Sequence, residues 1–123
     1  MDGKSVRLKP QENFTFDHVF DINATQVHMN AALKIPNLVR LQMKVYEATA
    51  KPLAKSLLEG YNCTCFAYGQ TGSGKTHTME GSSASEEMWG IIPRIMKDIF
   101  EGIADVDEEW EFLVNVSYIE IYL

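Results

Sequence analysis

Residues 69–76 read Gly-Gln-Thr-Gly-Ser-Gly-Lys-Thr and fit the pattern G-x-x-x-x-G-K-[ST]. Residues 63–68, directly before them, form a short apolar run without polar alternation, which is typical of a strand buried on both faces of a parallel sheet. The glycines let the backbone curl so that successive N–H groups point at phosphate oxygens. A helix beginning near residue 75 would add its own N–H groups. The sequence therefore predicts a strand–loop–helix unit that binds phosphate.

The last two residues of the loop have specific expected roles. Lys75 would reach the β and γ phosphates of a nucleotide, and the Thr76 hydroxyl would ligate Mg²⁺. From average residue usage, a chain of this length matches the pattern by accident roughly once in two hundred times. The strand before the loop and the helix after it make an accidental match rarer still.

Composition narrows the class of protein. Of the 123 residues, 46% are apolar and 23% charged, which suits one globular domain. The net charge of −6 argues against a nucleic-acid-binding protein. No apolar stretch reaches the roughly 18 residues that span a bilayer, and no secretory signal is apparent, so we expect a cytoplasmic protein. Cys63 and Cys65 are expected to be reduced, buried thiols.

Hydrophobic periodicity predicts an α/β order of elements around the loop. Helix 45–58 is placed by a stripe of every fourth residue (Val45, Thr49, Leu53, Leu57), with Pro52 either kinking it or starting a shorter helix. A second helix, 90–103, carries Ile at every fourth position, and its Asp98 and Glu101 are expected on the solvated face. Strands are expected at residues 14–16, 63–68 and 112–123.

A phosphate-loop hydrolase also needs a second metal-holding acid at the end of an apolar strand. Glu120 lies in the middle of the last predicted strand, and Asp105 and Asp107 follow a helix. None of the three meets the requirement, so we predict no catalytic residue within the chain.

Four stretches carry recognisable signatures: residues 14–20 (FTFDHVF), residues 58–62 followed by 66–79 around the phosphate loop, residues 90–94 (GIIPR) and residues 116–123 (VSYIEIYL). The first resembles an early signature of the kinesin motor domain, especially that of conventional kinesin heavy chains. The others resemble that family's phosphate-loop signature, the start of its next helix and the following strand. The resemblance implies that residues 1–123 are the N-terminal portion of such a domain. The implied fold is α/β: an incomplete P-loop NTPase fold with a central, mostly parallel sheet flanked by helices.

The resemblance also implies a function and a site. The family activity is microtubule-stimulated ATP hydrolysis that drives movement along the cytoskeleton, so ATP, Mg²⁺ and the microtubule (tubulin) are the implied cofactors and partner. His77 corresponds to the residue that stacks on adenine, and Tyr68 would pack beneath the loop. The residues implied to hold the nucleotide are Gly69, Gln70, Thr71, Gly72, Ser73, Gly74, Lys75, Thr76 and His77.

The chain departs from the family pattern in two ways. It contains neither N-x-x-S-S-R, which senses the γ phosphate in the family, nor D-L-A-G-S-E, which links the metal site to the track surface. These residues alone are therefore not expected to be a competent motor. Residues 27–44 stand where the family has about two residues. We interpret them as an insertion that forms a solvent-exposed excursion, with a helix at about 37–44 packed on the domain as the alternative. Their charge of +3 is expected to be a solvated basic face rather than a tubulin contact.

Two other interpretations remain open at this point. The chain could be a truncated, non-functional or interaction-only product, or it could be another phosphate-loop NTPase such as a GTPase or small-molecule kinase. No N-K-x-D guanine signature is present, which disfavours a GTPase. The sequence does not specify an oligomeric state.

Overall fold

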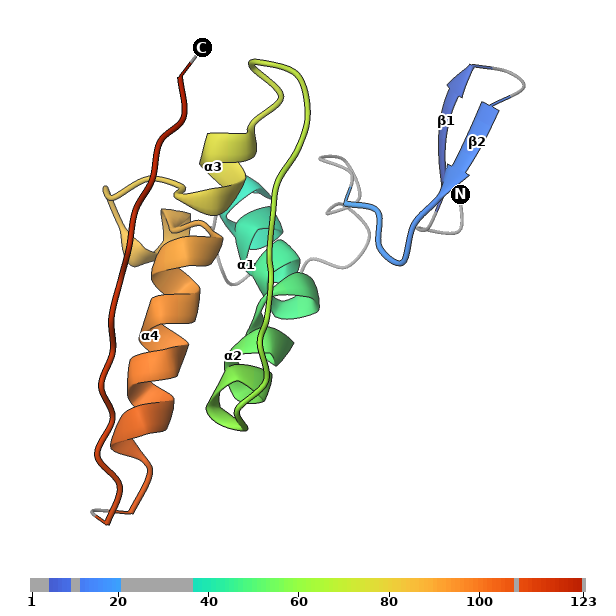
Figure 1. Ribbon diagram of the computed structural model, residues 1–123. Coiled ribbons are helices and arrows are strands. Elements are labelled where there is room, and N and C mark those ends of the chain that lie inside the picture. The colour runs from blue at the N-terminus through green and yellow to red at the C-terminus, as the bar shows by residue number, and fades with distance from the viewer. Residues whose placement is uncertain (1–4, 10–11, 21–36, 108, 123) are drawn as a thin grey trace, which may run out of the picture.

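The computed structural model describes the backbone of residues 5–9, 12–20, 37–107 and 109–122. Its elements, in chain order, are β1 (Ser5–Lys9), β2 (Glu12–Thr15), α1 (Asn37–Thr49), α2 (Lys51–Leu58), α3 (Lys75–Met79), the 3₁₀ turn η2 (Glu86–Met88) and α4 (Ile91–Ala104). Helices α1, α2 and α4 pack together, α3 lies at one end of this group, and the β1–β2 hairpin stands to one side (Figure 1).

A thin layer of side chains between α1, α2 and α4 forms the core. Tyr46, Ala50 and Ile91 are buried at its centre, and Val45, Met79 and Ile95 pack against them. The buried positions of the first two helices are Gln42, Tyr46, Ala50 and Ala54, which recur every fourth residue. The predicted stripe was therefore one residue out of register, and Thr49 and Leu57 are exposed. Ala50 and Ala54 have only a methyl group as side chain, so the backbone around the α1–α2 junction can pack closely against its neighbours.

Proline decides how the first predicted helix is divided. Helix α1 ends at Thr49, and α2 begins at Lys51 with Pro52 in its first turn. Proline is tolerated there because a first-turn N–H has no partner within the helix. The second of the two alternatives for Pro52 is thus confirmed. The second predicted helix is also confirmed, as α4, with Pro93 again in the first turn.

Residues 37–44 correct the expectation for the insertion. They form the first half of α1 and are not a solvent-exposed excursion, although residues 27–36 lie outside the described part of the chain. Leu41 is half-buried and Gln42 is buried. The alternative, a helix packed back on the domain, is the one that the structure contains. The same buried stripe continues from Tyr46 back to Gln42, so the helix crosses residue 44 without a change of register.

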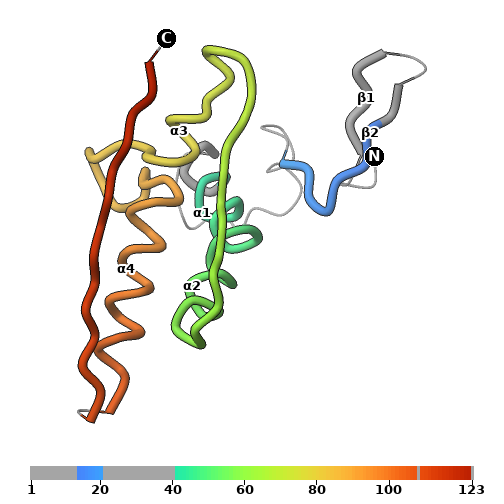
Figure 2. The backbone as a smooth tube through the Cα atoms, viewed as in Figure 1, coloured from blue at the N-terminus to red at the C-terminus, as the bar shows by residue number. Residues whose placement is uncertain are grey.

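Two extended segments run across one face of the helices. In Figures 1 and 2, which share one viewpoint, residues 61–69 pass along α1 and α2 and residues 109–122 pass along α4. Among the described residues neither segment is paired in a sheet; β1 and β2 form the one sheet there, an antiparallel pair with Ser5 opposite Thr15. The predicted burial of residues 63–68 is not observed, and the central parallel sheet stays a prediction.

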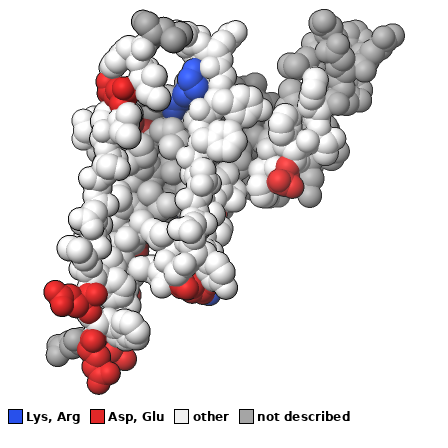
Figure 3. Space-filling view, in the orientation of Figure 1, with Lys and Arg blue, Asp and Glu red and all other residues white. Residues whose placement is uncertain are grey.

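The outer face of these two segments is apolar and exposed. Phe66 and Tyr68 are exposed in the first segment, and the second exposes Val116, Ile119 and Ile121. In the space-filling view this face is almost entirely uncharged, and acidic groups gather at its lower end (Figure 3). The chain exposes 10700 Å², whereas a compact monomer of 13.9 kDa would expose roughly 6700 Å². The exposed area is therefore larger than that of a compact monomer of the same mass.

Candidate phosphate-binding site

The loop at residues 69–74 owes its shape to glycine. Gly74 precedes α3 with φ of 94°, a left-handed conformation that residues with a side chain rarely adopt. Gly69 has φ of 150°, and a Cβ atom there would lie 2.7 Å from Oγ of Ser73. The N–H of Ser73 donates to the carbonyl oxygen of Gln70 at 3.2 Å and closes a turn. The loop is thus curled as the sequence motif predicts.

Lys75 lies with its charge over the loop. Its Nζ donates to the carbonyl oxygens of Gly69 at 2.6 Å and Gln70 at 2.8 Å. The side chain is half-buried, and within the described part of the chain no carboxylate forms an ion pair with it. The ammonium group of Lys75 therefore donates to two neutral carbonyl oxygens. Phosphate oxygens in their place would form stronger hydrogen bonds, because both partners would be charged.

The residues after Lys75 present polar groups to solvent. Thr76 is exposed, and α3 begins at Lys75 as predicted, although it ends at Met79. Among the described residues, the backbone N–H groups of Gly74, Lys75 and Thr76 have no acceptor. These donors and the Thr76 hydroxyl fit a phosphate group with a bound Mg²⁺, since hydroxyl and phosphate oxygens suit that ion. The described residues contain no cluster of three or more His, Cys, Asp or Glu side chains that could hold a metal by itself.

His77 is held from α1 by a residue that the sequence analysis missed. The side-chain nitrogen Nε2 of Gln42 lies 2.9 Å from Nδ1 of His77 and donates to the His77 carbonyl oxygen at 2.5 Å. Gln42 was overlooked because residues 27–44 were interpreted as a surface excursion. The available signal was its place four residues before Tyr46, on the buried face of the same helix.

Two other expectations near the loop are wrong. Tyr68 does not pack beneath it: the side chain is 82% exposed, with its ring centroid 6.2 Å from that of Phe66. Cys65 is exposed and Cys63 half-buried, so only the free thiol state of the two cysteines agrees with the prediction. Both differences come from the 63–68 segment, which lies on the surface among the described residues.

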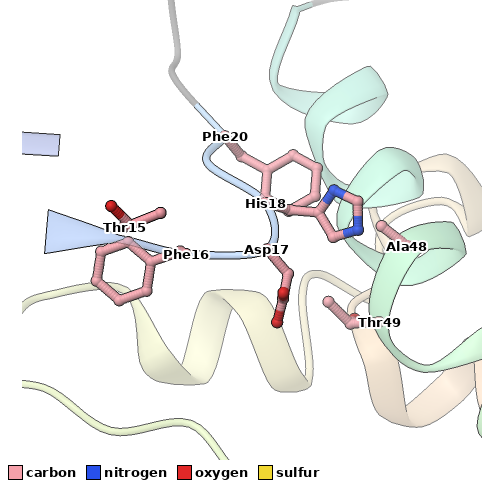
Figure 4. A pocket seen from close by; sticks show the side chains of 7 residues that line it. All are labelled: Thr15, Phe16, Asp17, His18, Phe20, Ala48 and Thr49. Carbon is pink, nitrogen blue, oxygen red and sulfur yellow. The ribbon is translucent and has the colours of Figure 1, made fainter. Parts of the chain in front are cut away.

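An open cavity lies away from the loop. It has a volume of about 870 Å³ and is open to solvent between residues 15–20 and the end of α1. Asp17 and His18 face Ala48 and Thr49 across it (Figure 4). No residue of the phosphate loop lines this cavity. Size alone therefore does not identify the functional site, and the loop's donors do.

The structure gives two of the acidic residues tyrosine hydroxyls as hydrogen-bond partners. Glu120 is exposed and accepts hydrogen bonds from the hydroxyls of Tyr122 and Tyr118, which lower the pKa of its carboxyl group. Asp98 is half-buried and accepts a hydrogen bond from Tyr46, so its expected place on the solvated face is wrong, whereas Glu101 is exposed as expected. Among the described residues, none of these three carboxylates has a hydrogen bond or an ion pair with residues 69–77. The prediction of no catalytic residue stays a prediction.

Comparison with known proteins places the chain in a class and then in a family. Solved structures that it resembles are motor domains, so its fold is part of a P-loop NTPase fold. The family model described as the kinesin motor domain matches residues 2–123. The chain belongs to the kinesin motor domain family.

Particular relatives show how much of the family's length is covered. The chain is 60% identical over 120 residues to human kinesin heavy chain isoform 5C, and this match spans 98% of the chain but 11% of that protein. A structure of a fast kinesin, described with implications for ATPase mechanism and interactions with microtubules, matches with a TM-score of 0.66 and 35% identity, over 88% of this chain and 27% of that one. Drosophila Kin10/NOD, crystallised with divalent manganese and ADP, matches with a TM-score of 0.62 and 37% identity, over 85% and 31%.

Proposed function

We propose that this chain is the ATP-binding front part of a microtubule-based kinesin motor. The observation that carries the proposal is the Lys75 side chain lying over the curled loop 69–74, within a chain of the kinesin motor family. The residues proposed to hold the nucleotide are Gly69, Gln70, Thr71, Gly72, Ser73, Gly74, Lys75, Thr76 and His77.

Each residue type in the loop has a physical role in this proposal. Lys75 exchanges its two carbonyl acceptors for phosphate oxygens and neutralises part of their charge. The loop N–H groups donate to the remaining phosphate oxygens. Thr76 supplies a hydroxyl ligand to Mg²⁺, which screens the phosphates when it is bound. His77 offers an exposed aromatic ring, two residues beyond Lys75, against which a base can lie.

The wider activity is also a proposal, because the chain covers only 11% of the curated relative described above. We propose that the whole protein hydrolyses ATP in response to microtubules, moves on them and is located on the cytoskeleton. The central, mostly parallel sheet of this fold would be completed by strands beside the two extended segments. The alternative of an interaction-only product is supported by their exposed apolar face. Among the described residues, no helix combines the length and the apolar character needed to cross a membrane.

Binding of labelled ATP with Mg²⁺ tests the proposal directly. The Lys75→Ala variant should lose at least about tenfold in affinity, since one charge-assisted pair contributes about 1.5–3 kcal/mol. The matched control is Lys51→Ala, which removes an exposed lysine from α2. Equal ATP affinity in the Lys75→Ala variant and the unmodified chain would show that the loop assignment is wrong. Competition by GTP separates a kinesin-type site from a GTPase.

A further inference from the structure

Gln42 occupies an unusual place for a long polar residue. It is 6% exposed, on the buried stripe of α1 one turn before Tyr46. A buried amide is costly unless its groups are hydrogen-bonded. The partner that the structure gives its nitrogen is His77, 35 residues along the chain and directly after the phosphate loop.

The carbonyl contact fixes the orientation of the Gln42 amide. A carbonyl oxygen can only accept, so the Gln42 atom 2.5 Å from the His77 carbonyl oxygen must be the amide nitrogen. The same nitrogen lies 2.9 Å from Nδ1 and 3.5 Å from Nε2 of His77, so it is close to the ring as well as to the backbone.

From these contacts we propose that Gln42 is a positioning residue for recognition of the nucleotide base, acting through His77. Its amide nitrogen binds the His77 backbone and lies close to the ring, which is still exposed beside the loop. This inference rests on the proposed nucleotide site and concerns the base rather than the phosphates. It also gives the 27–44 segment a role, because that segment supplies Gln42.

The inference predicts a loss that depends on the presence of a base. Gln42→Met keeps the side-chain length and removes both donors. The variant should bind Mg·ATP roughly five- to tenfold more weakly, as expected for one lost positioning contact, and inorganic tripolyphosphate with Mg²⁺ within about twofold of the unmodified chain. Met43→Gln, on the exposed neighbouring position of the same helix, is the control and should change neither affinity.

A double-mutant cycle shows whether Gln42 acts through His77. In a His77→Ala background, Gln42→Met should cause no further change in the ratio of ATP to tripolyphosphate affinity.

The outcomes separate this inference from the proposed function. Failure of the unmodified chain to bind tripolyphosphate would overturn the proposed phosphate site. The inference would also be overturned if the unmodified chain bound tripolyphosphate tightly but Gln42→Met lost the same affinity for ATP and for tripolyphosphate. Gln42 would then have a purely structural role.

Discussion

The hydroxyl of Tyr46 on α1 donates a 2.6 Å hydrogen bond to Oδ2 of Asp98 on α4. Tyr46 is 5% exposed and belongs to the small core, so this bond ties the polar end of a core residue to the neighbouring helix. Burial and the bond to Asp98 both raise the pKa of the Tyr46 hydroxyl well above its ordinary value of 10.0. The contact joins the two helices that frame the described domain.

Removing this hydroxyl should destabilise the chain. Tyr46→Phe keeps the buried ring and leaves the half-buried Asp98 without its donor, so we expect a loss of about 1–2 kcal/mol in the free energy of unfolding. Urea denaturation at neutral pH measures it. Asp98→Asn, which keeps an acceptor at this position, is expected to cost less. An unchanged midpoint for Tyr46→Phe would mean that the bond contributes nothing in solution.

Alkaline pH should reveal the same contact. Because the folded-state pKa of Tyr46 is raised, its stabilising contribution is complete below the unfolded value of about 10 and is lost as the pH rises through the folded value. Unfolding free energies measured from pH 8 to 11.5 should therefore fall more steeply for the unmodified chain than for Tyr46→Phe. Tyr118 and Tyr122 are present in both proteins, so the difference between the two curves isolates Tyr46. If the unfolding free energies of the two proteins fell in parallel with pH, the raised pKa of Tyr46 would be contradicted.

The sequence predicts local features of this molecule well. The loop, its lysine and the helix at α4 follow from glycine chemistry and from isoleucine at every fourth position, both of which act over short distances. The break at Pro52 was foreseen as one of two alternatives for the same reason. Such features need no knowledge of distant parts of the chain.

Features that depend on distant contacts were harder to predict. The buried stripe of α1 was misplaced by one residue, because small alanines at positions 50 and 54 are buried by close packing that a hydrophobic pattern undervalues. Residue Gln42 was missed because residues 27–44 were interpreted as a surface excursion, and its partner, His77, lies 35 residues away in the sequence. The segment 63–68 has a strand-like sequence, but strand pairing requires a neighbour.

The exposed apolar segments should make the isolated chain bind hydrophobic dyes and associate. Residues 109–122 are extended, and three of their apolar side chains, Leu113, Val116 and Ile121, are largely exposed. Such surfaces are aggregation-prone. Replacing Val116 and Ile121 with lysine should lower dye fluorescence and light scattering, with little change in the unfolding midpoint. If the two substitutions left the dye fluorescence unchanged, the apolar surface that binds the dye would lie elsewhere.

These 123 residues alone should not act as a motor. They contain neither N-x-x-S-S-R nor D-L-A-G-S-E. The exposed Glu120 accepts hydrogen bonds from the hydroxyls of Tyr118 and Tyr122. We expect ATP to be bound without microtubule-stimulated hydrolysis. Single-turnover assays with radiolabelled ATP, with and without microtubules, test this, and an intact kinesin motor domain serves as the positive control. Stimulation by microtubules that depends on Lys75 would contradict the prediction.

Limited proteolysis should show that the described part of the 27–44 segment is helical. The bond after Arg40 lies inside α1, and a protease needs an extended backbone, so this bond should resist trypsin in the folded chain. Met43→Pro places a proline at an exposed position of the helix interior, which should break its first half at a cost of about 3 kcal/mol and expose the bond. Cleavage after Arg40 should then become faster in the variant, as followed by mass spectrometry of the early fragments. Because Met43 lies outside the core, α2 and α4 should keep their resistance. Rapid cleavage after Arg40 in the unmodified chain would instead support the solvent-exposed excursion, and it would remove the helix that places Gln42 against His77.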